Sequence, residues 1–218
     1  TRVEIEQDSD GRVTVKTHYD HDHGLEWLKG SRPCKIAYTL LVPASSEVHV
    51  KTVSGSVSVR GLQEKVEVKS VSGDVELSDL TGKVELEVVS ADASLLRING
   101  DLRTDAVSGD VSVRESNCQS LRASTVSGDM KVETPLGSGP YDFRSVSGSV
   151  RLTVPGETNC SVRMTSISGR IHTTMPVTAR TSHHGHQSAE VQGGGVGIHV
   201  NTVSGNFSLE HTGEVKPA

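Results

Sequence analysis

Aromatic residues are nearly absent from this chain. They make up 3% of its 218 residues, with one tryptophan, three tyrosines and two phenylalanines. All apolar residues together reach only 33%, against nearly half in an ordinary soluble domain. This scarcity argues against a large globular core filled with aromatic rings. Disorder is not expected either, because the apolar residues are mostly β-branched and recur at regular spacing.

Long apolar runs and a dominant charge are also missing. The chain has no stretch of 18 consecutive apolar residues, so no membrane-spanning helix is predicted. The formal net charge is −5, with acidic and basic residues interspersed. Neither nucleic acid nor insertion into a membrane is therefore expected.

Cysteine is rare and odd in number. The three thiols are Cys34, Cys118 and Cys160, and an odd number cannot all pair within one chain. Their spacing fits neither a zinc knuckle nor a redox CxxC motif. We interpret all three as free thiols that pack as small apolar side chains. This leaves both a cytoplasmic and an extracellular location open.

What the chain does have is an internal repeat. A Val-Ser-Gly tripeptide or a close variant occurs eight times, at steps of 18, 18, 18, 19, 20, 21 and 36 residues. The last step is twice the first, as if one copy had been lost or replaced by an insertion. The copies begin at Val53, Val71, Val89, Val107, Val126, Val146, Ile167 and Val203.

Each period consists of a turn, a short strand, a second turn and a second short strand. Apolar residues alternate after each turn, as in Val57 and Val59, and this period of two predicts strands with one buried face. A unit of this size buries its apolar face only against its neighbours. We therefore predict an all-β fold, a parallel β-solenoid whose coils have the 18-residue repeat length. An antiparallel sandwich is the alternative, but hairpins have no reason to repeat one corner tripeptide.

The chain divides into three predicted parts. Residues 1–45 are expected to form an N-terminal β cap, with strands over residues 3–5, 12–17 and 35–42. A cap is expected because an open end of a solenoid exposes strand edges and core. Residues 46–211 form the solenoid, interrupted by an irregular loop over residues 176–195, and residues 212–218 form a polar tail.

The strand register predicts which side chains point inward. Glu76, Glu85, Lys131 and Arg151 should be exposed. The side chains expected to be buried are Val57, Val66, Val75, Val84, Val111, Met130, Val150 and Val162.

The corners give further expectations. Most corner glycines should have positive φ, whereas Ala91, which replaces one of them, should have negative φ or be strained. Gly128→Val, in the middle of the stack, should destabilise the fold more than Gly205→Val in the last coil, where only one neighbour is disturbed. Cys118 and Cys160 are expected two coils apart, beyond the reach of a disulfide.

The repeated unit resembles a known bacterial family. Its copies read VSGDVEL, INGDLRT, VSGDVSV and VSGDMKV, with Leu41-Val42-Pro43 before them and Gly193-Gly194-Gly195 before the last copy. Over nearly the whole chain, these segments resemble the bacterial family of adhesin-like domains of unknown function. The resemblance implies a parallel β-solenoid of a cell-envelope or secreted protein. It implies no established catalytic residue.

Two kinds of side chain suggest cation binding. Asp74, Asp92, Asp110 and Asp129 follow the corner in four consecutive copies, and stacked carboxylates could bind calcium. The competing interpretation is that each aspartate accepts a hydrogen bond from its own turn. Histidines suited to zinc or nickel form two clusters, His18, His21 and His23 near the N-terminus and His183, His184 and His186 near the C-terminus.

The two outer faces of the predicted solenoid carry charges of both signs, suited to solubility and weak ion pairs. Such long flat faces also suit a protein or glycan partner, although they offer no aromatic side chain for sugar stacking. One face carries Glu67, Lys69, Glu85, Glu87, Arg103, Asp105, Arg122, Asp142, Arg144 and Arg163, and the other carries Arg60, Glu76, Arg114, Lys131, Glu133 and Arg151.

We therefore predict a non-catalytic structural or interaction module, adhesin-like, of the bacterial cell envelope or cell exterior, with no cofactor. Short coils leave little loop length for a catalytic cleft, and no G-x-S-x-G motif is present. The alternative is a metal-binding protein or metal-dependent enzyme that uses one of the histidine clusters. Polysaccharide cleavage is a more distant alternative.

Overall fold

The structure is a computed structural model that describes residues 2–18, 36–156, 158–183 and 185–212. These residues form strands and turns and no helix, as the all-β prediction requires. Accordingly, the described part of the chain offers no helix long and apolar enough to cross a membrane. The strands are β1 (Arg2–Gln7), β2 (Val13–His18), β3 (Val48–Ser54), β4 (Val57–Arg60), β5 (Val66–Ser72), β6 (Val75–Ser90), β7 (Ala93–Ser108), β8 (Val111–Arg114), β9 (Asn117–Ser127), β10 (Met130–Glu133), β11 (Tyr141–Ser147), β12 (Val150–Val154), β13 (Cys160–Ser166), β14 (Ile171–Thr173), β15 (Val177–His183), β16 (His186–Val191), β17 (Val196–Thr202) and β18 (Phe207–His211).

The chain splits into two compact units, Thr1–Leu41 and Val42–Ala218. In the first unit, β1 and β2 form an antiparallel hairpin in which Ile5 lies opposite Val15. The third strand predicted for this segment is wrong, because residues 36–43 form no strand. Without a pairing partner their apolar side chains stay in water, and Leu41 is 97% exposed. The role of this unit as a cap stays a prediction.

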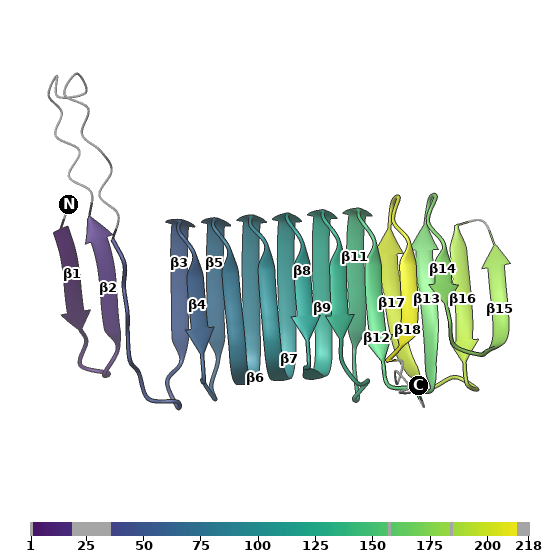
Figure 1. The fold of residues 1–218 in the computed structure, drawn as a ribbon, viewed down its shortest axis with the longest axis horizontal. Helices are drawn as coiled ribbons and strands as arrows, with labels where there is room; N and C mark the ends of the chain where they lie inside the picture. The colour runs from purple at the N-terminus through teal and green to yellow at the C-terminus, as the bar shows by residue number, and fades with distance from the viewer. Residues whose placement is uncertain (1, 19–35, 157, 184, 213–218) are drawn as a thin grey trace, which may run out of the picture. The chain divides into compact units, whose positions relative to one another are not determined.

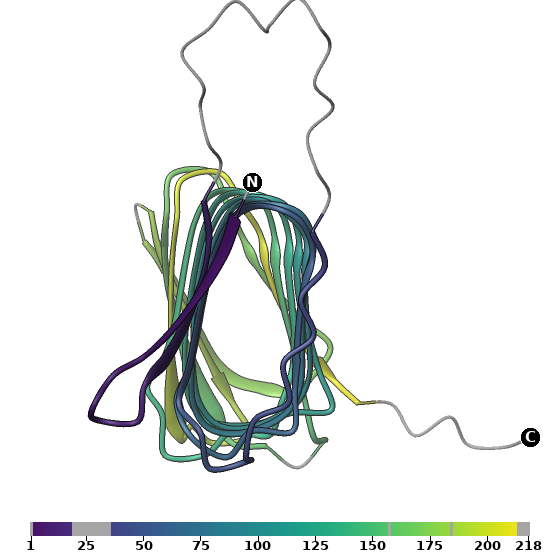
Figure 2. The same cartoon turned by 90° about the vertical axis from the view of Figure 1, so that its left-hand side faces the viewer.

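The second unit is a parallel β-solenoid. Strands of successive coils pair in parallel and in register, so that Val48 lies beside Val66 and Val66 beside Val84. The 16-residue strands β6 and β7 run along both faces and join them into one ladder. Figure 1 shows the strands of this unit side by side, and in Figure 2 its coils overlie one another as one flattened loop.

The core is a thin layer between the two faces. Seven of the eight side chains predicted to be inside are at most 2% exposed, and Val57, in the first coil, is partly exposed. Glu76, Lys131 and Arg151 are exposed as predicted. Glu85 points outward but is half-buried, because the ammonium groups of Lys65 and Lys83 lie within 3.1 and 2.6 Å of its carboxylate.

The coils are not stacked in chain order. β17 lies between β11 and β13, pairing in parallel with both, and β18 likewise lies between β12 and β14. The last coil of the sequence is therefore the penultimate coil of the stack. The buried ring of Phe207 lies 6.0 Å from that of Phe143, between ring centres. The returning coil is thus part of the core.

The end of the stack is closed by a hairpin. Residues 176–195, predicted to be an irregular loop, contain the antiparallel strands β15 and β16. β16 also pairs antiparallel with β13 and buries Ala189 and Val191. The side chain of Gln187 donates to the Gly169 carbonyl and accepts from the Ile171 amide, so it bridges to the opposite face. The prediction failed because a hairpin with one small apolar face lacks the repeat pattern.

The inserted coil also corrects the predicted spacing of the thiols. Cys118 lies near the start of β9, and Cys160 is the first residue of β13. The strands β11 and β17 lie between these two strands in the stack. They are therefore three coils apart rather than two, about 14 Å along the stack. Both thiols are free and buried, whereas Cys34 lies outside the described residues.

The corners explain the repeated glycine. Gly73, Gly109, Gly128 and Gly148 have positive φ, as predicted for most corners, and Ala91 is not among the residues with positive φ. A Cβ on Gly128 would lie 2.1 Å from the Gly109 carbonyl oxygen, far inside van der Waals contact. At Gly128 a side chain is thus excluded twice, by the backbone angle and by the neighbouring coil.

The premise of the expected ranking of Gly205 and Gly128 is wrong, because the coil of Gly205 is not the last coil of the stack. Gly205 lies between two other corners, because its own Cβ would meet the Gly148 carbonyl and a Cβ on Gly169 would meet the Gly205 carbonyl. Gly205→Val therefore disturbs two neighbours, as Gly128→Val does. The better comparison is Gly55, in the first coil, where a Cβ would have no other atom within 4 Å.

We predict that Gly128→Ala lowers the free energy of unfolding more than Gly55→Ala does. The two positions have φ of 133° and 121°, so a Cβ strains both backbones by a similar ~1–2 kcal/mol. Only Gly128→Ala adds an overlap with the next coil, expected to cost about 1–3 kcal/mol more. Denaturant unfolding of the two variants measures the difference, and equal midpoints would contradict the stacked corner.

We also predict that amides of β17 exchange with solvent more slowly than those of β15. β17 is bonded to a strand on each side, whereas β15 pairs only with β16 among the described strands. Hydrogen–deuterium exchange should show protection in β17 higher by a factor of about 100 or more. Fast exchange throughout residues 196–202 would instead indicate a last coil at the open end.

Candidate functional site

One surface of the solenoid is a continuous line of β-branched side chains. The first residue of every corner tripeptide points outward, and the eight side chains stack along the parallel coils from β3 to β13. We call this line the valine row. Six of its members are 42–47% exposed, Val53 is 73% exposed and Ile167 is 84% exposed. In stack order the valine row is Val53, Val71, Val89, Val107, Val126, Val146, Val203 and Ile167.

The valine row is exposed because of where it lies in each strand. In β5, for example, Val66, Val68 and Ser70 point inward, so Val71 points outward at the point where the strand enters the corner. The same alternation holds for every coil. The repeated valine is therefore retained at a position where water, not the core, surrounds it.

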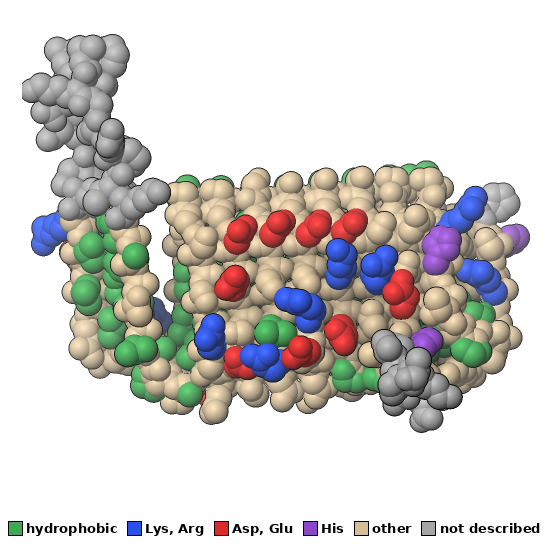
Figure 3. Space-filling view, viewed as in Figure 1, with side chains coloured by type: hydrophobic (Ala, Val, Ile, Leu, Met, Phe, Trp, Pro, Cys, Tyr) green, Lys and Arg blue, Asp and Glu red, His purple; other side chains and the backbone are tan. Residues whose placement is uncertain are grey.

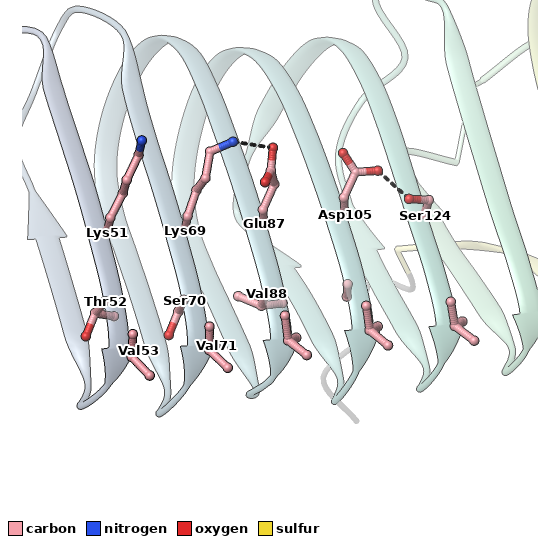
Figure 4. Close-up of a pocket in the computed structure, with 14 residues that line it drawn as sticks. Lys51, Thr52, Val53, Lys69, Ser70, Val71, Glu87, Val88, Asp105 and Ser124 are labelled. Carbon is pink, nitrogen blue, oxygen red and sulfur yellow. Dashed lines mark hydrogen bonds and ion pairs between the residues drawn. The ribbon is translucent and has the colours of Figure 1, made fainter.

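A second line runs beside the valine row, two residues earlier in each strand. We call it the charged row, although three of its members are uncharged. Its acids and bases form pairs across coils, such as the 2.8 Å ion pair between Lys69 and Glu87, which raises the pKa of Lys69. Figure 4 shows this pair and the hydrogen bond from Ser124 to Asp105, with the valines on the corner beside them. In stack order the charged row is Lys51, Lys69, Glu87, Asp105, Ser124, Arg144, Asn201 and Thr165.

The two rows together line a shallow groove of about 740 Å³ along the first five coils. Its lining is mainly apolar and includes the valine row and the residues that precede it, such as Val88 and Ala106. Its polar rim is the charged row. A rigid, flat, partly apolar strip of this kind can bind another surface but has no enclosed volume in which to hold a small substrate.

A third line of outward-pointing side chains lies two residues before the charged row in each strand and completes this face. Its ion pairs include Arg122 with Asp142, 3.6 Å apart. Hydrogen bonds from Lys83 and Lys65 hold the pKa of Glu85 below its usual value. All ten charged residues predicted for this face lie in the charged row or in this third line, which in stack order is His49, Glu67, Glu85, Arg103, Arg122, Asp142, His199 and Arg163.

The opposite face has no comparable apolar line. Figure 3 shows it, with acidic and basic side chains mixed and a line of acidic side chains along its upper edge. Its outward positions are mostly serine and charged residues, and Leu96 is a partly exposed exception. At its lower corner, Arg97 forms ion pairs with Asp79 and Glu115 at 2.6 and 3.6 Å. The exposed valines therefore distinguish one face from the other.

The corner aspartates are used for hydrogen bonding between coils. The Oδ1 atoms of Asp92, Asp110 and Asp129 accept from the backbone amide at the equivalent position of the next coil, at 2.8–2.9 Å. The acceptor is thus the carboxylate of the previous coil rather than of the same turn. Near the end of the stack an amide oxygen does the same, since Asn206 Oδ1 accepts from the Arg170 amide at 3.1 Å.

The described histidines form no metal centre. His18 Nε2 lies 2.7 Å from Glu4 Oε2, while His21 and His23 fall outside the described residues. His183 and His186 face each other across β15 and β16, and His184 again is not described. No three metal-ligating side chains of the described residues come together in a group that could hold an ion. Metal binding by the complete clusters stays a prediction.

Three buried groups, two thiols and one phenol, are unsuited to chemistry. Burial raises the pKa of Cys118 and of Cys160 to about 11, so their thiols stay protonated and weakly nucleophilic near neutral pH. Burial also raises the pKa of Tyr141, whose hydroxyl donates to the Cys118 carbonyl at 2.7 Å.

The aspartate ladder makes a clear prediction. Asp110→Asn keeps an acceptor oxygen, as the natural Asn206 does, and should change the free energy of unfolding by less than about 1 kcal/mol. Asp110→Ala leaves the Asp129 amide without its acceptor and should cost about 1.5–3 kcal/mol. Thermal unfolding with and without millimolar calcium tests this. Stabilisation by calcium that both substitutions abolish would instead show a cation site.

Comparison with known proteins places this geometry in a family. The family model described as Toastrack DUF4097 matches residues 7–138 and, in a second overlapping stretch, residues 105–210. No curated protein matches the chain. Among solved structures, it is similar to a "putative cell adhesion protein from Clostridium sporogenes ATCC 15579", with 7% identity and a TM-score of 0.36 over 78% of this chain and 93% of that one.

The overlap of the two family matches reflects the repeat, since an alignment can begin at more than one coil. The matches together span residues 7–210, which is most of the chain and includes the whole solenoid. The adhesin-like resemblance of the VSGD units is confirmed at the level of family and fold. The chain belongs to the Toastrack DUF4097 family.

Proposed function

We propose that this chain is a non-catalytic, adhesin-like interaction module of the bacterial cell envelope or cell exterior, and that the valine row is its docking surface. The observation that carries the proposal is the outward position of all eight corner residues, each of them valine or isoleucine. Single exposed apolar residues are ordinary on a protein surface. A contiguous line of them, bordered by polar residues, is typical of an interaction site.

The energetics of the valine row favour binding. Covering a half-exposed valine gains about 1 kcal/mol. Valine has a single, already restricted side-chain torsion, and in-register pairing fixes the backbone of each coil. Little conformational freedom is therefore lost when a partner binds. A row of such side chains on a rigid rod can add these small gains along its length.

The partner that best fits this surface is a protein. Sugar binding commonly uses stacking on aromatic rings, but Tyr141, Phe143 and Phe207 are all buried in the core of the solenoid. Valine methyl groups instead suit apolar side chains of a partner, and the charged row supplies a polar rim with both signs. This composition matches the usual arrangement of an apolar strip with a polar border.

The non-catalytic part of the proposal is supported by how the reactive side chains are placed. The two described thiols are buried, and the corner aspartates accept hydrogen bonds from the backbone. The charged side chains of the described faces lie along flat strands, and several of them form ion pairs across coils, such as Lys69 with Glu87 and Arg122 with Asp142.

The proposal predicts that Val89→Ser combined with Val107→Ser weakens binding of the purified chain to cell-envelope preparations of the source bacterium. Removing two central apolar contacts should reduce affinity by a factor of about 10 or more. Leu96→Ser, on the opposite face, is the matched control and should bind like the unchanged chain. Thermal unfolding confirms that all three proteins are folded. Equal binding by the double variant and the control would contradict the valine row as the docking surface.

A further inference from the structure

The valine row has a fixed period that its partner must match. Strands of neighbouring coils are about 4.8 Å apart, so the eight side chains extend over about 34 Å. An irregular protein surface meets such a row at only a few points. A second copy of the same row has the same period by construction, so its side chains can meet those of the first along the whole row.

We infer that a second copy of this chain occupies the valine row, with the two solenoids face to face and antiparallel. The inference rests on the proposed function, since it needs the valine row to be a docking surface. Most homodimers have two-fold symmetry, which allows the two rods to run parallel or antiparallel. The charged row decides between these two arrangements.

In a parallel arrangement the two-fold axis runs along the rods, and each coil meets its own copy. When the valine rows face each other, this axis places the charged row of the second copy on the opposite side of the interface. The two charged rows then do not meet, and their charges gain no partner of opposite sign. The charged row therefore favours the antiparallel dimer.

The antiparallel arrangement with full overlap has its centre between Val107 and Val126. Every member of the valine row then faces another member of the row. In the charged row, Glu87 faces Arg144 of the other copy, and the two copies form this pair twice. Every other charge faces an uncharged residue, Lys51 opposite Thr165, Lys69 opposite Asn201 and Asp105 opposite Ser124.

Two features make the Glu87–Arg144 contact specific. Arg144 is exposed and forms no ion pair with any residue that the structure describes, so it is available to a partner. Sliding one copy by one coil in either direction shortens the overlap. In one direction it also sets Asp105 against its own copy and Lys69 against Arg144. In the other direction it sets Asp105 against Arg144, but it leaves one member of each valine row uncovered. Full overlap is therefore the register that combines the charge pair with contact along the whole valine row.

The size of the contact indicates weak association. A strip about 34 Å long and about 10 Å wide buries roughly 700 Å² over both copies, less than the ~1,200 Å² of stable complexes. We therefore expect a dimer that dissociates in the micromolar to millimolar range and that forms most readily where copies are concentrated on one surface.

Sedimentation equilibrium of the full chain at increasing concentration tests the inference. The unchanged chain should dimerise, and Glu87→Arg or Arg144→Glu should each weaken dimerisation by a factor of about 10. The double variant Glu87→Arg with Arg144→Glu should recover most of the loss, because the pair re-forms with reversed charges. Lys131→Glu, which changes an exposed cation on the opposite face, is the control and should dimerise like the unchanged chain.

Three results would overturn the inference. These are a monomer at every concentration up to the millimolar range, single charge variants that dimerise normally, and a folded double variant that fails to recover. If the chain is monomeric while Val89→Ser with Val107→Ser still weakens envelope binding, the valine row is a docking surface for another protein. In that case the proposed function stands and the second copy is excluded. If neither property changes, both fail.

Discussion

The close approach of backbone at the corners is the constraint on which the rest of the structure depends. Corner glycines of successive coils lie so near one another that a Cβ on Gly128 or Gly148 would fall 2.1 Å from a carbonyl oxygen of the neighbouring coil. Because each corner fits against the next only in one position, every coil is held in register. The parallel ladders, the thin core and the outward rows all follow from that register.

Register converts a repeated sequence into repeated surfaces. A residue type that recurs once per coil forms a line of side chains, and neighbouring members of the line are about 4.8 Å apart. Aspartate after the corner becomes a ladder of hydrogen bonds between coils, and valine before the serine becomes an apolar line in water. The first line stabilises the stack, and the second leaves a large part of each side chain in water. This contrast connects the fold to the proposed docking function.

Much of the fold could be predicted from the sequence. The repeat and the alternation of apolar residues predict the parallel coils, and they place side chains such as Val66 and Met130 correctly in the core. The position of the last coil could not be predicted, because Val203 carries the same local pattern as Val146 and the pattern does not say which neighbour it stacks on. The hairpin of β15 and β16 was missed because a segment outside the repeat gives no periodic signal.

Of the predicted metal ligands, His18, His183 and His186 are described and form no centre, and metal binding by the complete clusters stays a prediction. The valine row was also missed, since apolar residues are ordinarily assigned to the core. The sequence did contain a signal for it. The repeated valine directly follows an inward-pointing residue, so the alternation of the strand places it on the outside.

Distances along the valine row test the central claim most directly. Spin labels on cysteines at position 71 and at position 146, 203 or 167, in a chain with Cys34 replaced by serine, allow these distances to be measured by pulsed electron paramagnetic resonance. The account predicts that they rise in equal steps from about 19 Å at position 146 to about 24 Å at position 203 and about 29 Å at position 167. Residue 203 would then lie nearer than residue 167, against chain order. A distance to residue 203 that exceeds the distance to residue 167, or distances that do not rise in steps of about one strand spacing, would contradict the in-register stack and the row that it presents.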